Sequence, residues 1–145
     1  MATKKTIGIW ILVSTFIVVA WVLGFELATK FGSAIAQQAA PTESKGLTRT
    51  VLTVVDLGPE IAGMQGRQLE LRMVTIEPGG VAGVHSHKDL PGVAHVLKGT
   101  ITEHRGDVAK EYKAGDSFNE VGSHWFDNKG TGPVVVIVGI ITKKQ

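Results

Sequence analysis

The sequence predicts an all-β fold, a small sandwich or barrel, preceded by one apolar N-terminal helix that is a transmembrane or signal segment. Three observations predict it. After residue 50, short β-branched or alternating segments are separated by Gly and Pro. No stretch in that region combines a helical apolar period with helix caps. Residues 7–25, in contrast, are apolar and carry no charge.

The N-terminal apolar run is long enough to cross a membrane. At ~1.5 Å per residue, residues 7–25 would form a helix of roughly 28 Å, close to the thickness of the hydrocarbon core of a bilayer. Lys4 and Lys5 precede it and should hold the N-terminus in the cytoplasm. Two interpretations stay open: an uncleaved signal anchor, which we favour, and a signal peptide cleaved after the small-x-small sequence at residues 34–36.

Both interpretations export the folded part of the chain. The domain is expected at the cell membrane on its outer, periplasmic side, or free in the periplasm if the N-terminal segment is cleaved. We assign residues 1–30 to the signal anchor or signal peptide and residues 31–49, rich in Ala, Gln, Ser and Thr, to a flexible linker. Residues 50–145 form the β-domain.

Charge and cysteine content exclude two classes of function. The chain has 15 Lys/Arg and 13 Asp/Glu, and its excess positive charge lies before Gln37, so the β-domain is balanced. No basic stripe with interleaved aromatic residues is present there, so we expect no nucleic-acid partner. The absence of cysteine excludes disulfides and cysteine–zinc sites.

The strands of the β-domain follow from alternation and punctuation. In the second expected strand, the apolar odd positions of residues 69–73 lie on one face and Glu70 and Arg72 on the other. The sequence Pro-Gly-Gly at 78–80 should end that strand. The apolar run at 134–141 should be buried on both faces. Strands are expected at residues 50–56, 68–77, 93–98, 100–104, 108–112, 117–120, 123–127 and 134–141.

Histidines are gathered in one part of the β-domain. All five lie between His85 and His124, with His87, His95 and His104 between them. His85 and His87 are two residues apart, a spacing that points both imidazoles to the same side of a strand. Two such imidazoles can chelate one metal ion, and a third ligand must come from elsewhere in the chain.

The residues around the histidines resemble two known motifs. Gly79, five residues and His85-Ser86-His87 are followed by Gly99. Further on, Gly115-Asp116 is followed by His124 and Asn128. This pattern resembles the two motifs of the cupin superfamily, over residues from about 70 to 141. The resemblance implies a double-stranded β-helix, the cupin jelly-roll barrel, that holds one divalent metal ion, for which Fe, Mn, Zn and Ni are the candidates.

By this resemblance His85, His87 and His124 are metal ligands. The sequence departs from the family at Gly92, where the family carries a metal-binding glutamate. Glu120 is the best replacement, because a carboxylate four residues before His124 could reach the same ion across a tight turn. It ends the segment Gly-Asp-Ser-Phe-Asn-Glu, which looks like a subset of cupins that lacks the usual glutamate.

Other ways of completing the site stay open. His95 and Asp89 are the next candidates for the fourth ligand, and a three-histidine site with bound water is also acceptable. Alternation along the strand from Gly92 turns residues 94 and 96 inward and His95 outward. Trp125, next to His124, is expected to pack in the core; the alternative is that it forms a wall of the ligand pocket.

Several functions are compatible with such a site. The first hypothesis is an exported, metal-dependent cupin that binds or acts on a small molecule, with oxygenase or isomerase chemistry implied by the resemblance. The second is a non-enzymatic module that binds or senses a small ligand. The third is a structural β-domain with a degenerate, metal-free site. The sequence leaves open whether the chain is an enzyme, and the resemblance also implies a homodimer.

Overall fold

The computed structural model describes residues 39–144. The β-domain lies within the unit Ala40–Gln145, which is separate from the part of the chain that precedes it. The predicted N-terminal helix at residues 7–25 lies outside the described residues. Among residues 39–144, no helix is both long and apolar enough to cross a membrane.

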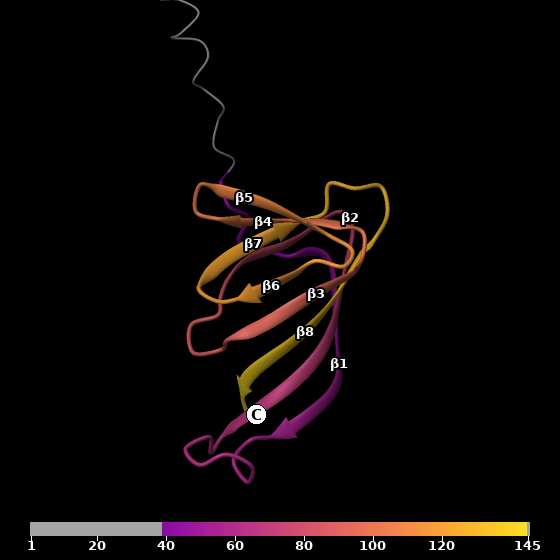
Figure 1. Cartoon of the computed structure of the whole chain (residues 1–145). Helices are drawn as coiled ribbons and strands as arrows, with labels where there is room; N and C mark the ends of the chain where they lie inside the picture. The colour runs from indigo at the N-terminus through magenta and orange to yellow at the C-terminus, as the bar shows by residue number, and fades with distance from the viewer. Residues whose placement is uncertain (1–38, 145) are drawn as a thin grey trace, which may run out of the picture. The chain divides into compact units, whose positions relative to one another are not determined.

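The described unit is all-β, as the sequence predicts. Its strands are joined by turns, and residues 39–144 contain no helix. Two predicted strands are confirmed at both ends, and most others extend by a few residues (Figure 1). The strands are β1 (Lys45–Asp56), β2 (Arg67–Ser86), β3 (Gly92–Lys98), β4 (Thr100–Arg105), β5 (Val108–Lys113), β6 (Ser117–Glu120), β7 (Ser123–Asp127) and β8 (Val134–Lys143).

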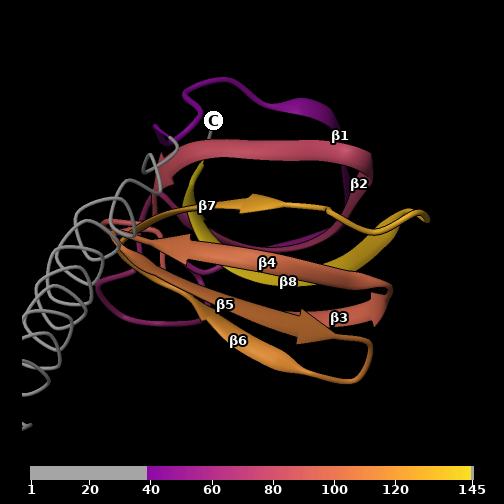
Figure 2. The same ribbon diagram turned by 90° about the horizontal axis from the view of Figure 1, so that it is seen from above.

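The strands form one curled antiparallel sheet of the jelly-roll type. Neighbours along the sheet follow the order β5-β4-β7-β2-β8-β3-β6, and β1 adds to the outer side of β2. Seen from above, β1 and β2 lie opposite β3, β5 and β6, so the sheet wraps around an interior (Figure 2). This wrapping brings the second part of β2 to β7, which carries His124.

β2 is longer than predicted, because Pro-Gly-Gly bends it without ending it. Before the bend β2 pairs with β8, up to Ile76 opposite Val134; after the bend it pairs with β7, from Val81 onward. Gly79, with φ of +69°, adopts the left-handed conformation that glycine tolerates. Thus residues 78–80 mark the point where β2 changes partner, as bends and bulges do where strands switch sheets.

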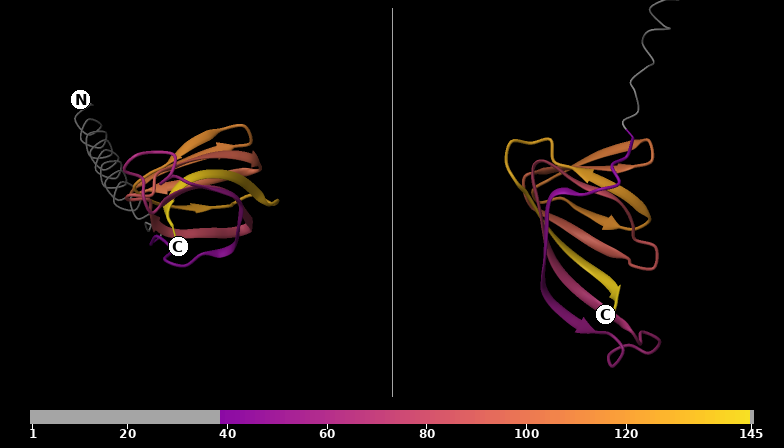
Figure 3. Two further views of the ribbon diagram at one scale, coloured as in Figure 1. Left: turned by 90° about the horizontal axis from the view of Figure 1, so that it is seen from below. Right: turned by 180° about the vertical axis from the view of Figure 1, so that it is seen from behind.

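β1 also begins earlier than predicted, at Lys45 instead of Thr50. The last residues of the expected linker are therefore strand, because their backbone pairs with β2, as in Leu47 opposite Ile76. Preceding residues contact the same strand: Ser44 Oγ accepts a hydrogen bond from the Gly83 N–H at 3.0 Å. In the view from behind, β1, β2 and β8 run side by side (Figure 3).

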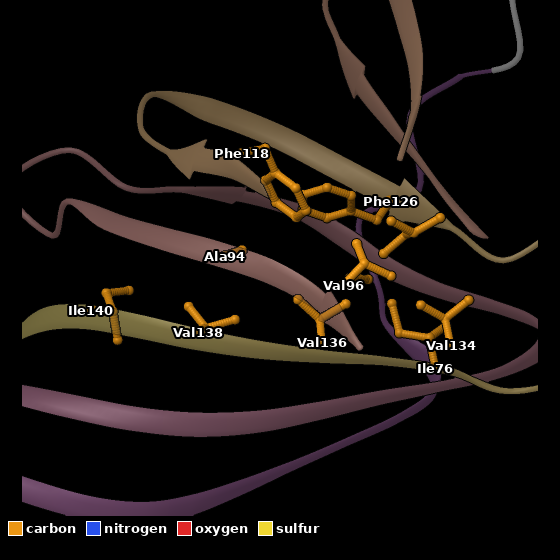
Figure 4. Close-up of a cluster of buried hydrophobic side chains, with 11 residues drawn as sticks. Ile76, Ala94, Val96, Phe118, Phe126, Val134, Val136, Val138 and Ile140 are labelled. Atoms are coloured by element: carbon orange, nitrogen blue, oxygen red, sulfur yellow. The ribbon is translucent and has the colours of Figure 1, made fainter. Parts of the chain in front are cut away.

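The hydrophobic core lies along β8. Its alternate residues point inward and are buried, from Val134 to Ile140, and they face Val96 of β3 and the rings of Phe118 and Phe126 (Figure 4). The intervening residues of β8 are only half buried. The prediction that β8 is buried on both faces was therefore wrong: its inner face meets the core, and its outer face is covered only in part.

The inner face of β2 carries the charged residues Glu70 and Arg72. Glu70 is only 6% exposed, whereas Leu69 is 41% exposed on the opposite face. A cavity of about 550 Å³ lies inside the barrel, and Arg72 and Val74 contribute to its wall. Charged side chains can face inward here because this part of the interior is a cavity and not a close-packed core.

Candidate metal centre

The structure brings His85, His87, Glu120 and His124 together at the cavity wall. One ligand-type atom from each lies within 4.8 Å of those of the other three. All four are half buried or buried. The four side chains that the sequence singles out as a metal set thus meet at one place, although they come from three separate strands and a turn.

Strand pairing accounts for the approach of the three imidazoles. His85 of β2 lies directly opposite His124 of β7, and their ring centroids are 4.7 Å apart. His87 follows the last residue of β2 and remains tied to the turn before β7, because its N–H donates to the carbonyl oxygen of Gly122 at 2.6 Å. Its ring centroid lies 4.9 Å from that of His124.

The position of Glu120 explains the glycine at position 92. Gly92 of β3 lies directly opposite Glu120 of β6. A Cβ atom at residue 92 would lie 3.2 Å from Glu120 Cβ and 2.9 Å from the carbonyl oxygen of Gly139, closer than a side chain there could sit without displacing its neighbours. The carboxylate therefore comes from the strand opposite the family's glutamate position, and the missing side chain leaves room for it.

Each histidine of the cluster is oriented by its Nδ1 atom. The Nδ1 atoms of His85 and His87 lie 2.8 Å and 3.1 Å from the carbonyl oxygens of Gly83 and Leu90. His124 Nδ1 lies 2.6 Å from Glu103 Oε1. Because these oxygens only accept, each Nδ1 donates, and a neutral ring then carries its lone pair on Nε2. Metal-ligating histidines are held in this way.

Within the described part of the chain, the Nε2 atoms of His87 and His124 have no hydrogen-bond partner. His87 Nε2 and His124 Nε2 lie 3.1 Å and 2.9 Å from Glu120 Oε2, but neither contact has the geometry of a hydrogen bond. These three buried atoms are left without a hydrogen-bond partner. Lone-pair atoms this close repel unless a proton or a cation lies between them, and leaving them unpaired costs free energy. The donor set, imidazole nitrogen with carboxylate oxygen, fits a divalent metal ion.

Electrostatics keep the carboxylate ionised. Burial alone would raise the pKa of Glu120, but His124 and His87 beside it lower the pKa to about 2. Burial opposes protonation of His87, yet the Glu120 carboxylate outweighs burial and raises the pKa of His87. Burial lowers the pKa of His85, and the neighbouring His124 acts in the same direction. Near neutral pH the cluster therefore offers an anionic oxygen beside imidazole nitrogens.

Sequence reasoning missed Glu103, which orients His124. Glu103 is 4% exposed, and its carboxylate also contacts Arg105 Nη2 at 2.6 Å and accepts a hydrogen bond from the Tyr112 hydroxyl at 3.3 Å. The sequence does contain an indication of this role. Alternation along β4 puts Glu103 on the same face as Ile101, which lines the cavity. A charged residue on an inward face indicates a buried polar role.

The other candidates lie outside the cluster. His95 points away from it, as alternation predicts, and its Nδ1 lies 2.9 Å from Ser117 Oγ. Asp89 lines the cavity without joining the cluster. Trp125 is buried, as expected, and stacks on His104 with ring centroids 3.6 Å apart. Of the proposed fourth ligands, Glu120 lies in the cluster, and His95 and Asp89 do not.

The cavity beside the cluster is large enough for a small organic molecule. Three of the cluster residues line its wall, namely His85, His87 and Glu120. The rest of the wall combines apolar and basic side chains. The apolar ones include Leu47, Ile76, Phe118, Phe126, Val136, Val138 and Ile140, and the basic ones are Arg49, Arg72, Lys88, Lys143 and Lys144.

A jelly-roll barrel with a histidine and carboxylate cluster at its cavity defines a class of small β-barrel proteins with an inward-facing polar site. Comparison of the sequence with models of known families identifies the family. Residues 72–140 match the family model described as Cupin domain, and this part of the chain is a domain of the cupin superfamily. The match begins within β2 and includes the four cluster residues. Among curated proteins no match is found.

Solved structures agree on the fold. A cupin-2 domain from Rhodospirillum rubrum is 21% identical, with a TM-score of 0.54, covering 77% of this chain and 69% of that one. The polyketide cyclase RemF from Streptomyces resistomycificus is 19% identical, with a TM-score of 0.54 and coverages of 71% and 69%. A cupin 2 domain-containing protein from Halorhodospira halophila is 19% identical, with a TM-score of 0.52 and coverages of 69% and 68%. At these identities the likeness extends to the fold alone.

Proposed function

We propose that this chain binds one divalent metal ion, Fe, Mn, Zn or Ni, through His85, His87, His124 and Glu120, and that it binds or transforms a small molecule in the adjoining cavity. The observation that carries the proposal is the state of the ring nitrogens. Each of the three histidines uses Nδ1 to donate to an oxygen. The Nε2 atoms of two of them remain buried beside an ionised carboxylate without a hydrogen bond.

The chain's own residues would prepare the site before any ligand arrives. Glu103 fixes the ring of His124, and the backbone oxygens of Gly83 and Leu90 fix the other two rings. Fixed rings lose little conformational entropy on binding a metal ion. A bound divalent ion would act as a Lewis acid and orient an oxygen-bearing ligand. The apolar wall formed by residues such as Phe118 and Ile140 would keep water away from that ligand.

Metal content is the direct test of this proposal. The full chain, produced without a histidine tag and dialysed against each of the four metals, should retain about one ion per chain. The double variant His85→Ala/His87→Ala should retain none, because half of the ligands are gone. The matched control His95→Ala removes a histidine outside the cluster and should retain the ion. A wild-type chain that takes up none of the four metals would overturn the proposal.

Whether catalysis follows binding depends on turnover. Oxygenase or isomerase chemistry is what the family resemblance suggests. A non-enzymatic binding role is supported by a different observation: the one carboxylate of the cluster, Glu120, already contacts two histidines and is held ionised. It is therefore poorly suited to accept a proton from a substrate. A screen of phenolics, keto acids and sugars separates the two, because a ligand that raises the melting temperature without turnover favours binding.

We further propose that the cupin domain acts on the outer side of the cytoplasmic membrane, attached through the N-terminal segment or released from it. The uncharged run at residues 7–25 behind Lys4 and Lys5 supports this location. Fractionation of cells that produce the full chain tests it. The chain should be found with the membrane or in the periplasm and should be cut by protease added to spheroplasts. A protected chain would contradict export.

A further inference from the structure

A second polar group faces the barrel interior outside the His/Glu cluster. Glu70 is buried and contacts Nε of Arg72, which lines the cavity. Its carboxylate also accepts hydrogen bonds from Gln68 Nε2 at 2.8 Å and Thr142 Oγ1 at 2.7 Å. The Arg72 side chain is 26% exposed, and an ion pair that is partly open to water contributes little net stability. Core stability therefore does not explain why this pair faces the interior.

The contact with Glu70 fixes the Nε side of the Arg72 guanidinium and leaves its two Nη atoms available to a ligand. Glu70 holds Nε, while within residues 39–144 no hydrogen bond uses Nη1 or Nη2 of Arg72. Arg49 of β1 lies opposite Val74, and its side chain lines the same cavity. Two guanidinium groups against one carboxylate give this part of the wall a net positive charge.

The strand register measures the separation between the pair and the cluster. Gly92 lies opposite Glu120 on one side and Ile140 on the other, and Arg72 lies opposite Val138. Along β6-β3-β8-β2, Glu120 and Arg72 are thus three strand spacings apart, roughly 14 Å, and two residues apart along the strand direction, roughly 7 Å. Together these give a separation of roughly 16 Å along the curved sheet. Because both side chains line one cavity, a small organic molecule can reach from one to the other across the intervening apolar wall.

We infer that the cavity binds a small organic acid with an apolar body, whose carboxylate pairs with Arg72 while its other polar end lies at the His/Glu cluster. This inference rests on the proposed function, because the second polar end needs the metal ion. Arginine suits the task, since its planar fork matches a carboxylate in a bidentate pair. Glu70 is a positioning residue that holds this fork in place.

Calorimetry with defined probes tests the inference. Linear dicarboxylates from succinate to suberate are titrated into the Ni²⁺-loaded full chain, beside their dimethyl esters as uncharged controls. At least one dicarboxylate should bind, and its ester should not. Arg72→Gln should weaken that binding by about 10- to 100-fold, and Arg72→Lys, which keeps the charge but loses the fork, should fall between. Lys98→Gln removes a charge from an exposed position and should change nothing.

The affinity for Ni²⁺ alone is measured for every variant, and it should stay unchanged. If Arg72→Gln fails to fold, the double variant Glu70→Gln/Arg72→Gln, which removes both charges, takes its place with the same expected loss. Equal dicarboxylate affinity in wild type and variant, or no dicarboxylate binding at all, would overturn the inference while Ni²⁺ binding leaves the proposed function intact. Failure of the wild type to bind Ni²⁺ or any of the other three metals would overturn both.

Discussion

His124 and Asn128 are both buried polar residues, four positions apart, yet the structure satisfies them differently. Asn128, 1% exposed, donates from Nδ2 to the carbonyl oxygens of Ile76 and Gly132, both at 2.9 Å, and accepts from the Gly130 N–H at 2.9 Å. His124, 2% exposed, makes one hydrogen bond through Nδ1, and its Nε2 has none.

This difference separates a polar residue that is satisfied within the protein from one that we propose to be a metal ligand. The hydrogen bonds of Asn128 close the turn between β7 and β8 and tie it to β2, so its side chain is complete within the protein. The unpaired nitrogen of His124 costs stability in the absence of a partner. The fold of the described residues therefore leaves Nε2 of His124 without a hydrogen-bond partner, whereas the side chain of Asn128, at the opposite end of β7, has its hydrogen bonds. Mutations at the turn should therefore change stability, and mutations at the cluster should change metal binding.

The largest expected effect is on the stability of Asn128→Ala. The change leaves the buried carbonyl oxygen of Ile76 and the backbone groups of the turn without their partner. It should lower the free energy of unfolding by about 3 kcal/mol. Urea denaturation measures the loss, with Asn119→Ala as the control, because the side chain of Asn119 is exposed. If Asn128→Ala is as stable as this control, the structural half of the comparison fails.

A second prediction concerns Glu103→Gln, which changes the site and not the turn. Glutamine keeps the shape of Glu103 but loses the negative charge that accepts the hydrogen bond from the His124 ring. Metal affinity should fall about 10- to 100-fold, as it does for other partners of metal-bound histidines. Titration calorimetry measures it. Glu111→Gln, on the exposed strand β5, is the control and should leave the affinity unchanged. Equal affinities in the two variants would remove Glu103 from the site.

The third prediction is a pH dependence of the metal-free chain. The folded pKa of Glu120 is lowered from 4.5 to about 2, so its contribution is present above pH 4.5 and is lost as the pH falls toward 2. The folded pKa of His87 is raised from 6.5, so its contribution is present below pH 6.5 and is lost as the pH rises through the folded value.

Together these two pKa shifts define the pH range in which the contact between Glu120 and His87 stabilises the folded chain. The stability that wild type gains over Glu120→Gln should be largest between pH 4.5 and 6.5 and should shrink on both sides. Urea denaturation in the presence of a chelator, at a series of pH values, measures this difference. A difference that does not vary with pH would show that the carboxylate and the imidazole do not interact in the metal-free state.

The smallest effect is expected for His95→Ala. His95 is half buried on the face of β3 away from the core, and its Nδ1 lies 2.9 Å from the Ser117 hydroxyl oxygen. Its loss should change the free energy of unfolding by no more than about 0.5 kcal/mol and should leave metal affinity unchanged. Thermal melting with and without metal measures both quantities. A loss of metal affinity in this variant would enlarge the site beyond the four cluster residues.

Local patterns single out the four residues that the structure brings together in the cluster. The His-x-His spacing places two imidazoles together, and the motif around His124 and Glu120 supplies the rest. Local patterns do not predict which distant strands pair or in which register. The contact between Glu103 and His124 depends on β4 lying beside β7, and the exchange of the glutamate position depends on the register of Gly92 against Glu120. Neither register can be read from one sequence.

The same limit applies to the fold. Alternation in β2 separates an apolar from a charged face, but only the curling of the whole sheet decides that the charged face, with Glu70 and Arg72, turns inward. Likewise Pro-Gly-Gly at 78–80 is a correct signal for a break in the ladder. The sequence cannot tell whether the strand stops there or bends toward a new partner, because that depends on the distant strand β7.

Anomalous diffraction from crystals of the chain soaked with Zn²⁺ or Ni²⁺ tests the metal centre most directly. One strong peak should appear within bonding distance of the Nε2 atoms of His85, His87 and His124 and of a Glu120 carboxylate oxygen. A crystal of His124→Ala should show a much weaker peak or none. Absence of the wild-type peak, or a peak bound by other residues while Glu120 still contacts the unliganded histidines, would contradict the account.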